Sequence, residues 1–544
     1  MSDAFITHEV LNQPPPLLDY DLFTTDRALT EAVAREGAGW AAEGLAAFGR
    51  RLGSAEVIEA GVQANRNPPV LQAFDRYGHR RDMVEFHPAW HGLMSLAVGE
   101  GLHTSPWAEP RPGAHVARAA AFYMMGQVEA GVQCSMAMTY GAAPTLRHAP
   151  AIAAEWLPRL YSRRYDPGFR PAPEKAGALM GMGMTEKQGG SDLRSNATRA
   201  EPVAEGEGAY RLVGHKWFFS APMCDAFLVL AQAPGGLTCF FLPRWTPAGD
   251  LNAIRLRRLK DKLGNRSNAS SEVEFQGALA WRVGEEGRGI ATIIEMATYT
   301  RLDCILGSAG LMRQALSQAV HHAAHRTAFQ RRLVDQPLMA NVLADLALEV
   351  EAATALAMRL ARAFDAQDDP AAIALRRLMT PAGKYWVCKR GPPLAAEAME
   401  VLGGAGYVEE GPMPRLYREL PLNSIWEGSG NVMCLDVLRA LGVAGVAEAL
   451  EAELTPARGG DARLDRSIDA ALEVMRSPPG EAGARRLCEL LVTTLQGALL
   501  MRFAPRAVAE GFCASRLGGG SGRAFGTLPD GVDQAAVIAR AWPL

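Results

Sequence analysis

The sequence lacks the features that mark secreted and membrane proteins. Among its 544 residues, no apolar run reaches the roughly 18–20 residues that a helix needs to span a bilayer. The first ten residues, MSDAFITHEV, lack a basic segment followed by an apolar one, so no secretory signal is visible. The eight cysteines are scattered, and no two of them form a CxxC pair. We therefore expect free thiols in a protein of the reducing cytoplasm, with no membrane partner.

Common nucleotide-binding and metal-binding motifs are also absent. The chain has neither a Walker A loop nor a GxGxxG fingerprint. His321, His322 and His325 form the densest histidine cluster, and the first and last share a helix face. No Glu stands between them as in HExxH, so we interpret the cluster as a polar helix face and expect no metal site. The net charge of −3 argues against a polyanion binder driven by overall charge, but it permits a local basic face.

Length and residue pattern predict several domains, beginning with a helical one over 1–178. A chain of 544 residues is too long for one hydrophobic core. Glu31–Leu52 and Ala117–Tyr140 are rich in Ala, Leu, Met and Glu, without the period of two that strands show. A loop signal interrupts this block at Asn67–Pro69, and the Pro-rich connector Asp166–Pro173 closes it.

A block of strands follows over 179–283. Phe227–Ala231 and Thr238–Leu242 are short β-rich runs, and Pro234-Gly235-Gly236 between them predicts a hairpin. Ser271–Phe275 alternates polar and apolar residues, as a half-buried strand does. These features predict a compact β-domain.

Helices return in the last two blocks, 284–443 and 444–544. From Val342 to Phe364, apolar residues recur at steps of three and four. This spacing predicts one face of a long helix that ends before Asp369-Pro370. The final block predicts further helices and a flexible Gly-rich loop at Ser515–Gly526.

Two segments carry residues suited to chemistry. Gly181–Asp192 (GMGMTEKQGGSD) offers glycines and hydroxyls that suit phosphate oxygens, although a Gly-rich turn is more often structural. Glu427 follows the apolar pair Ile425-Trp426 and precedes Gly428-Ser429-Gly430. A carboxylate that is partly desolvated in this way has a raised pKa, which suits a general base. A surface-loop or helix-cap glutamate is the alternative interpretation.

Six segments, in order, resemble motifs of the acyl-CoA dehydrogenase family. They are MTEKQGGSD (Met184–Asp192), GHKWFFS (Gly214–Ser220), DKLGNRSNASSEVEF (Asp261–Phe275), RTAFQ (Arg326–Gln330), EVLGGAGY (Glu400–Tyr407) and WEGS (Trp426–Ser429). Their variant spellings, with NQPPPL near the start and a long C-terminal extension, resemble one branch of the family. That branch serves the bacterial adaptive response to DNA alkylation.

The resemblance implies FAD as the cofactor and an α+β multidomain fold. The family has an N-terminal α-helical domain, a middle β-barrel or β-sandwich domain and a C-terminal four-helix bundle. This chain is expected to add a further C-terminal helical domain. The resemblance also implies a homotetramer, a dimer of dimers, in which a neighbouring subunit completes the FAD site between the β-domain and the bundle.

The resemblance assigns roles to individual residues. Glu427 is expected to take the α-proton of an acyl thioester while the β-hydride goes to flavin N5. Thr300, beside Arg301, stands where some members keep their base on an earlier helix. Arg326 is expected to reach the FAD pyrophosphate of a neighbouring subunit. The expected FAD-binding residues are Met184, Thr185, Gly190, Ser191, Phe218, Phe219, Ser220, Arg326, Phe329, Gly403, Gly404, Ser424, Trp426, Gly428, Ser429 and Asn431.

Departures from the family motifs lead us to expect weak or absent turnover of ordinary acyl-CoAs. Trp426 replaces the usual Tyr and puts a larger ring next to the expected base. Gln330 replaces a Gly. Glu400 replaces a Gln and adds negative charge near the expected FAD phosphates.

The same resemblance implies binding to double-stranded DNA, and the charge pattern of the C-terminal block supports it faintly. Residues 444–484 hold four Arg against eight acids, whereas residues 485–544 hold seven Arg against four acids. Such clustering can face phosphates, although a solvated helical face is the alternative interpretation. The candidate DNA-binding residues are Arg485, Arg486, Arg502, Arg506, Arg516 and Arg523.

Two functions remain open from the sequence. The first is a flavoprotein that binds double-stranded DNA and protects it from alkylating agents, with an acyl-CoA-like or alkylating small molecule at the flavin. The second is a metabolic short-chain or branched-chain acyl-CoA dehydrogenase whose C-terminal domain serves oligomerisation.

Overall fold

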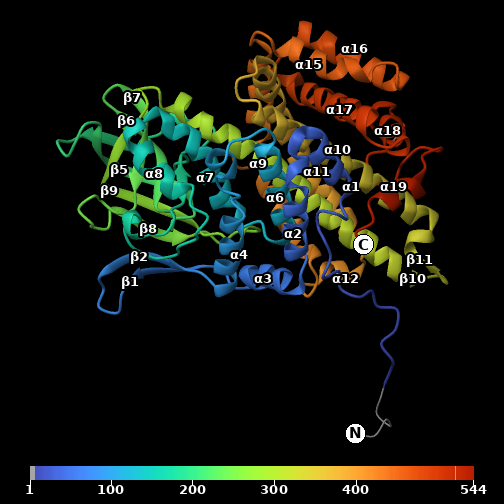
Figure 1. Cartoon of the computed structure of the whole chain (residues 1–544), viewed down its shortest axis with the longest axis horizontal. Helices are drawn as coiled ribbons and strands as arrows, with labels where there is room; N and C mark the ends of the chain where they lie inside the picture. The colour runs from blue at the N-terminus through green and yellow to red at the C-terminus, as the bar shows by residue number, and fades with distance from the viewer. Residues whose placement is uncertain (1–6, 521) are drawn as a thin grey trace.

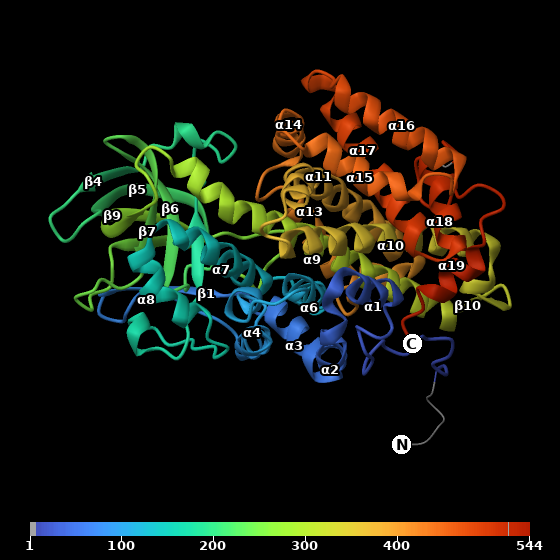
Figure 2. The same cartoon turned by 45° about the horizontal axis from the view of Figure 1, so that its top comes forward.

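The chain places a β-domain at one end and a large helical body at the other (Figures 1 and 2). The computed structural model describes residues 7–520 and 522–544. The N-terminal block is mainly helical, as predicted, and runs along one side of both parts. Its helices are α1 (Arg27–Val33), α2 (Ala42–Leu52), α3 (Ala55–Arg66), α4 (Pro88–Gly99), α5 (Ser105–Ala108), α6 (Ala114–Val128), α7 (Gln133–Thr145) and α8 (Pro150–Leu160).

One part of this block is a β-hairpin, which follows the loop signal at Asn67–Pro69 and was not predicted from the sequence. β1 (Val70–Phe74) pairs antiparallel with β2 (Arg80–Glu85). Arg80 donates to the Leu256 carbonyl at 2.8 Å, and the Asp82 carboxylate accepts from the Leu256 N–H at 2.9 Å. Because a lone two-stranded hairpin is marginally stable, these contacts with the β-domain stabilise the two strands.

The middle block forms the predicted β-domain. Its seven strands are β3 (Met180–Gly183), β4 (Arg199–Pro202), β5 (Ala209–Ser220), β6 (Ala226–Ala233), β7 (Gly236–Pro243), β8 (Ile254–Leu259) and β9 (Ser270–Val283). β6 and β7 are the predicted antiparallel hairpin. Because β7 pairs with β9 as well as with β6, the sheet closes on itself as a barrel.

Three long helices form the centre of the next block. They are α9 (Gly289–His325), α10 (Pro337–Asp365) and α11 (Pro370–Val401), and they pack on one another. α10 carries the predicted apolar stripe and ends before Asp369-Pro370. The shorter elements are β10 (Thr327–Ala328), β11 (Arg331–Arg332), α12 (Gly404–Tyr407), α13 (Met413–Asn423) and α14 (Gly430–Leu441), of which α13 and α14 pack on α11.

A buried ion pair joins the N-terminal block to this bundle. Arg118 on α6 lies with its Nη2 2.9 Å from Asp303 Oδ2 on α9, and the two side chains are almost fully buried. Arg118 also donates to the Leu102 carbonyl at 2.7 Å, and its guanidinium lies 3.8 Å from the centre of the Tyr140 ring. Removing either partner would leave a buried charge uncompensated.

The C-terminal helices share the hydrophobic core of α10 and α11. They are α15 (Val446–Leu454), α16 (Ala462–Arg476), α17 (Ala484–Phe503), α18 (Arg506–Phe512) and α19 (Gln534–Arg540), of which α16 packs on α17 and the others pack on α10 or α11. Leu491 and Leu495 of α17 belong to the same buried cluster as Leu356 and Leu360 of α10. Although α17 is long and largely apolar, neither it nor any other helix in the described ranges could cross a membrane.

Arg540 ties the last helix to the N-terminal and bundle helices. Its Nε lies 2.8 Å from Glu351 Oε1 on α10, and its Nη1 donates to Glu31 Oε1 on α1 at 2.9 Å. The Arg540 side chain is 9% exposed and Glu351 is 12% exposed, so most of this network is shielded from water.

Replacing Arg540 with methionine should loosen α19 from the bundle. The change leaves the Glu351 carboxylate shielded without its cation, which costs roughly 3 kcal/mol. Hydrogen exchange of the α19 amides should report a fall of that size in local opening free energy. Arg506→Met is the matched control, because Arg506 pairs with Glu510 in water, where a pair contributes less than about 1 kcal/mol. Equal effects of the two substitutions would contradict the buried-network account.

Candidate active site

A buried ion pair holds the candidate phosphate-binding turn that follows β3. Lys216 Nζ lies 2.7 Å from Glu186 Oε1, and both side chains are fully buried. Glu186 also accepts from the Ala197 N–H at 2.7 Å, and Lys216 donates to the Leu230 carbonyl at 2.8 Å. Although burial favours the neutral acid, the Lys216 ammonium lowers the pKa of Glu186 to about 2. Burial lowers the pKa of Lys216 to about 8, so both groups are charged at neutral pH.

This pair determines where the small and hydroxyl residues of the turn lie. At Gly190, an added Cβ would lie 2.4 Å from the Thr185 Oγ1, so a side chain does not fit without movement. Thr185 and Met184 are half-buried, while Gly190 and Ser191 are exposed at the surface of the turn. The turn therefore presents a hydroxyl-rich, side-chain-poor surface that suits phosphate oxygens.

The candidate flavin residues on β5 point to opposite sides of the strand. Phe218 is 49% exposed, and the Lys260 ammonium lies 4.7 Å from the centre of its ring. Ser220 is half-buried, with its Oγ 3.3 Å from Ser270 Oγ. The Phe219 side chain is fully buried and packs near Phe227, with ring centres 4.4 Å apart. Alternation along the strand turns this ring into the core of the β-domain, so a cofactor contact of Phe219, which stays a prediction, would come from its backbone.

Glu427 sits in a loop that the bundle holds in an unusual backbone conformation. Its φ is +59°, in the left-handed region that non-glycine residues rarely adopt. Arg301 on α9 donates from Nε to the Glu427 carbonyl at 3.0 Å. Lys384 on α11 donates to the Gly428 carbonyl at 2.6 Å. The loop is thus fixed by cations from two helices, and Glu427 is neither a surface glutamate nor a helix cap.

The Glu427 carboxylate contacts α9 at the position where some members of the acyl-CoA dehydrogenase family keep their base. Thr300 on α9 donates from its hydroxyl to Glu427 Oε2 at 2.7 Å. Burial raises the pKa of Glu427, while the Thr300 hydrogen bond and the charges of Lys384 and Arg301 lower it. The net direction is upward, as a general base that works near neutral pH requires.

The Trp426 side chain lies on the β-domain side of the Glu427 loop. Its indole N–H donates to Asn423 Oδ1 at 3.0 Å, and its ring packs against the hydrophobic cluster of the β-domain. Ser424 donates to the Pro421 carbonyl at 3.0 Å, so that hydroxyl serves the end of α13. Ser429 precedes the first residue of α14. The loop therefore brings Trp426 and Glu427 to the boundary between the bundle and the β-domain.

The expected FAD-binding residues and the candidate DNA-binding residues meet at Asn431. Arg485, a candidate DNA-binding residue on α17, donates from Nε to the Asn431 side-chain oxygen at 2.9 Å. Its guanidinium also lies 6.0 Å from the centre of the Tyr385 ring. Asn431 follows Gly430 at the start of α14, so the C-terminal helices contact the loop that carries Glu427.

Arg326 and Phe329 lie away from this loop. Arg326 follows the last residue of α9, donates to the Asn12 carbonyl and leads into the β10–β11 hairpin. Phe329 at the tip of that hairpin is 92% exposed. Figures 1 and 2 show β10 at the end of the molecule opposite the β-domain. A single chain therefore does not bring these residues to the turn after β3.

The residues fit FAD when those near the turn after β3 are combined with Arg326 and Gly403. The turn at Thr185–Ser191 offers hydroxyls, and the exposed Phe218 ring offers an apolar face for a flat ring system. Gly403 has φ +62° and nothing within 4 Å of an added Cβ, which leaves its backbone open to a phosphate. Arg326 supplies a cation suited to a pyrophosphate.

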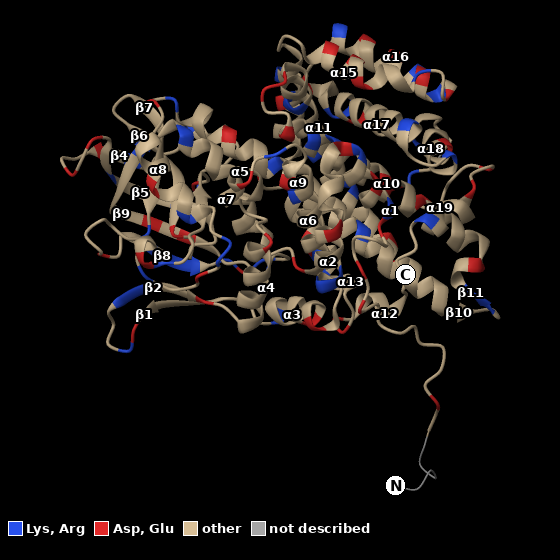
Figure 3. Ribbon diagram, viewed as in Figure 1, with Lys and Arg blue, Asp and Glu red and all other residues tan. Residues whose placement is uncertain are grey.

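The candidate DNA-binding arginines do not form one continuous basic strip. Arg516 is buried against α10, with its Nη2 2.6 Å from Asp345 Oδ1 and 3.1 Å from Glu349 Oε2. Arg502 donates to the Glu453 carbonyl at 3.2 Å. Arg486 and Arg523 are exposed. Figure 3 shows basic and acidic segments interleaved along α16 to α18. Arg516 is thus occupied inside the protein.

Lys216, Arg301 and Lys384 were not assigned a site role from the sequence. Lys216 lies inside the motif Gly214–Ser220, so the sequence could have indicated a role for it. Arg301 and Lys384 lie on long helices far along the chain from Glu427, and no local pattern marks them. Among the described residues, no cluster of three or more His, Cys, Asp or Glu could hold a metal ion. His321 instead bonds through Nε2 to the Pro15 carbonyl at 2.8 Å.

Family models match most of the chain in the same order as its structural blocks. Residues 12–167 match the adaptive response protein AidB N-terminal domain. Residues 181–278 match the acyl-CoA dehydrogenase middle domain, and residues 287–442 match the acyl-CoA dehydrogenase C-terminal domain.

Individual relatives agree with these models. The AidB protein of Escherichia coli (strain K12) is 52% identical over 510 residues, which is 93% of this chain and 94% of that protein. Acyl-CoA dehydrogenase family member 11 of Caenorhabditis elegans is 33% identical over 73% of this chain and 66% of its own length. The structure of Caenorhabditis elegans ACDH-11 in complex with C11-CoA superposes with a TM-score of 0.84 at 27% identity, covering 99% of this chain and 93% of that one.

These matches confirm the family, the fold class and the cofactor that the six motifs predicted. The chain belongs to the acyl-CoA dehydrogenase family as an AidB homologue, and it is a flavin oxidoreductase with FAD as its cofactor.

Proposed function

We propose that this protein serves the adaptive response to DNA alkylation, binds double-stranded DNA and has at most weak acyl-CoA dehydrogenase activity. The observation that carries the proposal is its 52% identity to Escherichia coli AidB across 93% of the chain. The match of residues 12–167 to an adaptive response domain supports it, because that part is distinct from the models for the dehydrogenase domains.

Glu427 is the catalytic base in this proposal. FAD, when bound, supplies the acceptor for a hydride. The Glu427 carboxylate takes a proton from the substrate carbon adjacent to the one that gives up the hydride. Thr300 orients the carboxylate through its 2.7 Å hydrogen bond. Lys384 and Arg301 hold the loop so that the carboxylate does not turn toward water. Positioning of this kind lowers the barrier because the reacting groups are already aligned.

Trp426 limits the substrates that reach this base. Its ring fills the space between the Glu427 loop and the β-domain, and its hydrogen bond to Asn423 restrains it there. Moving the ring would break that bond and expose apolar surface to water. Ordinary acyl chains are therefore poor substrates, and a smaller acyl or alkylating molecule fits better.

Two subunits complete each flavin site in the proposed assembly. The turn at Thr185–Ser191 and the Glu427 loop come from one subunit, and Arg326, Phe329 and Gly403 come from its neighbour. The 92% exposure of Phe329 leaves its ring free to contact a neighbouring subunit. By family resemblance, the assembly is a homotetramer.

DNA binding rests on exposed cations near the flavin loop and along α17. Arg485 and Lys389 lie beside the start of α14, and Arg486 and Arg523 are exposed. Arg516 takes no part, because Asp345 and Glu349 already neutralise it. No DNA-reading motif was recognised in the sequence, so the contacts are directed at phosphates and not at bases. A cytoplasmic location fits the eight cysteines, all of which are free and buried.

A metabolic acyl-CoA dehydrogenase is the second candidate. The intact Glu427 and the likeness to a structure in complex with C11-CoA favour it. In that case the C-terminal helices would serve stability and assembly alone, as the Arg540 and Arg516 ion pairs do within the chain.

The pH dependence of flavin bleaching by a short acyl-CoA tests the role of Glu427. Only the carboxylate accepts a proton, so the rate should rise with pH through the raised pKa of Glu427. Thr300→Val removes a hydrogen bond that lowers this pKa, so the rising limb should move to higher pH. Thr300→Ser, which keeps the hydroxyl, should leave the limb in place. Glu427→Gln should lower the rate by roughly 10²-fold or more. An unchanged rate in Glu427→Gln would remove Glu427 as the base.

The affinity for double-stranded DNA across a salt series tests the DNA proposal. Arg486→Gln with Arg523→Gln should weaken binding and reduce the slope of log affinity against log salt by about 0.9 for each phosphate that is no longer neutralised. The matched control is Arg458→Gln with Arg476→Gln, since both of these arginines already pair with acids. Point substitutions are preferable to truncation, because removing α17 would expose the bundle core. Absence of DNA binding by the unaltered protein at low salt would favour the metabolic candidate.

A further inference from the structure

The Lys262 ammonium lies close to the expected flavin residues of β5. Lys262, in the segment between β8 and β9, donates from Nζ to the Asn268 carbonyl at 2.6 Å and to Ser270 Oγ at 2.9 Å. Both acceptors are uncharged, in contrast to those of Lys216 and Lys260, which pair with glutamates at 2.7 Å. The charge of Lys262 is therefore not cancelled at contact distance by a carboxylate of the described residues.

The groups around Lys262 leave it a cation at neutral pH. Burial lowers its pKa to about 8, while the nearby Cys134 thiol and the carboxylates of Glu419 and Glu129 raise it. Cys134 lies on α7, Glu129 follows α6 and Glu419 lies on α13. The two glutamates also face the buried guanidinium of Arg415, so their negative charge is shared between two cations.

Two serines connect this ammonium to the side of β5 on which Phe218 is exposed. Ser270 Oγ lies 3.3 Å from Ser220 Oγ. Because an ammonium only donates, Ser270 Oγ accepts from Lys262 and has its own proton available for Ser220 Oγ. In that arrangement the Ser220 hydroxyl keeps its proton for an acceptor beyond the protein. These three side chains, Lys262, Ser270 and Ser220, form the relay, and a cation at its start strengthens the hydrogen bonds along it.

The Cys134 thiol connects the relay to the Glu427 loop. Cys134 forms a hydrogen bond with the Ser220 side chain. Burial raises the pKa of Cys134 to about 11, the charge of Lys262 lowers it and the charge of Glu427 raises it. Lys262, Ser220 and Glu427 thus surround one thiol. Since a thiol is a weak acceptor, the Ser220 proton is available to a stronger acceptor on a bound cofactor.

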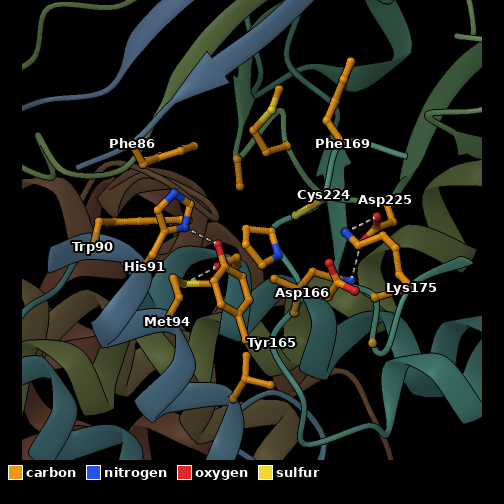
Figure 4. A pocket seen from close by; sticks show the side chains of 18 of the residues that line it. Phe86, Trp90, His91, Met94, Tyr165, Asp166, Phe169, Lys175, Cys224 and Asp225 are labelled. Carbon is orange, nitrogen blue, oxygen red and sulfur yellow. Dashed lines mark hydrogen bonds and ion pairs between the residues drawn. The ribbon is translucent and has the colours of Figure 1, made fainter. Parts of the chain in front are cut away.

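The relay is separate from the cavity of about 250 Å³ between the N-terminal block and the β-domain, which Trp90 and Cys224 line (Figure 4). Ala221 also lines that cavity, whereas its neighbour Ser220 does not. Substitutions in the relay therefore act on the flavin side of β5 and do not open onto this cavity.

We propose that Lys262, acting through Ser270 and Ser220, stabilises the negative charge that reduction places on the bound flavin and so raises its reduction potential. The inference rests on the expected contact of Ser220 with the flavin. Hydrogen bonds and charges of the protein tune the electronics of a cofactor. A cation that is fixed in a site shielded from water stabilises such charge more strongly than one in water. Because it acts through the two serines, Lys262 is a positioning residue.

The midpoint potential of the FAD-loaded protein, with FAD affinity measured in both redox states, tests this inference. Lys262→Met should weaken binding of reduced FAD roughly tenfold or more relative to oxidised FAD, which lowers the midpoint potential by about 30 mV or more. Ser270→Ala keeps the cation but interrupts the relay, so the same ratio should fall roughly threefold to tenfold. Ser270→Thr, which keeps the hydroxyl, should leave the potential in place. So should Arg258→Met, the matched control, which removes an exposed cation already paired with Glu272.

The outcomes separate a redox role from a structural one. Equal loss of affinity for both redox states, with an unchanged potential, would give Lys262 a structural role only and overturn the inference. If Lys262→Met binds no FAD, the comparison of Ser270→Ala with Ser270→Thr decides, and equal potentials in those two variants overturn the relay.

Ser220→Ala distinguishes the two ways in which the inference can fail. An unchanged potential in Ser220→Ala would contradict the expected contact of Ser220 with the flavin, on which the inference rests. A potential that falls in Ser220→Ala but in neither Lys262→Met nor Ser270→Ala would keep that contact and contradict the relay.

Discussion

The active-site loop depends on one constraint, the left-handed backbone at Glu427. A non-glycine residue in this conformation costs on the order of 1 kcal/mol or more, so surrounding contacts must hold it. They come from Thr300 and Arg301 on α9 and from Lys384 on α11. The loop therefore takes its shape only when the bundle has formed. The same contacts adjust the basicity of the carboxylate, so the backbone of the loop and the pKa of the proposed base depend on one set of side chains.

Buried ion pairs join the blocks of this protein. Lys216–Glu186 holds the turn after β3, Arg118–Asp303 joins the N-terminal block to α9, and Arg540 joins α19 to α1 and α10. A buried pair adds little stability compared with a well-packed apolar contact, but losing one partner is costly. Such pairs therefore favour one arrangement of the blocks over others. They also explain why arginine content alone is a poor guide to a DNA-binding face in this chain.

Local patterns predicted much of the fold. The Pro234-Gly235-Gly236 turn and the apolar stripe from Val342 to Phe364 are short-range signals, and both appear where they were expected. The hairpin at residues 70–85 escaped prediction because its stability comes from Leu256, far along the chain. Motif resemblance predicted FAD, which the comparisons confirm, and a role for Glu427, which stays a prediction. It could not separate the inward Phe219 from the exposed Phe218. That distinction requires knowing which face of β5 meets the core.

Partners far along the chain explain why the surroundings of individual arginines could not be predicted from the sequence. Arg516 and Arg485 carry the same charge in the sequence, yet one pairs with Asp345 and Glu349, and the other bonds to Asn431. Nothing within a few residues of either arginine distinguishes these fates. The partners lie on α10 and α14, which approach only through tertiary packing.

The central claim is that each flavin site is built by two subunits, and mixed assemblies test it most directly. Gly190→Leu should crowd the turn after β3, and Arg326→Glu should repel the pyrophosphate, so each variant alone should lose FAD. In a mixed pair of these variants, one of the two sites combines an intact turn with an intact Arg326. The account predicts that about half of the sites in isolated mixed pairs regain FAD. If each variant alone loses FAD and the mixed pairs also stay without it, the turn after β3 and Arg326 act within one chain. That result would contradict the account.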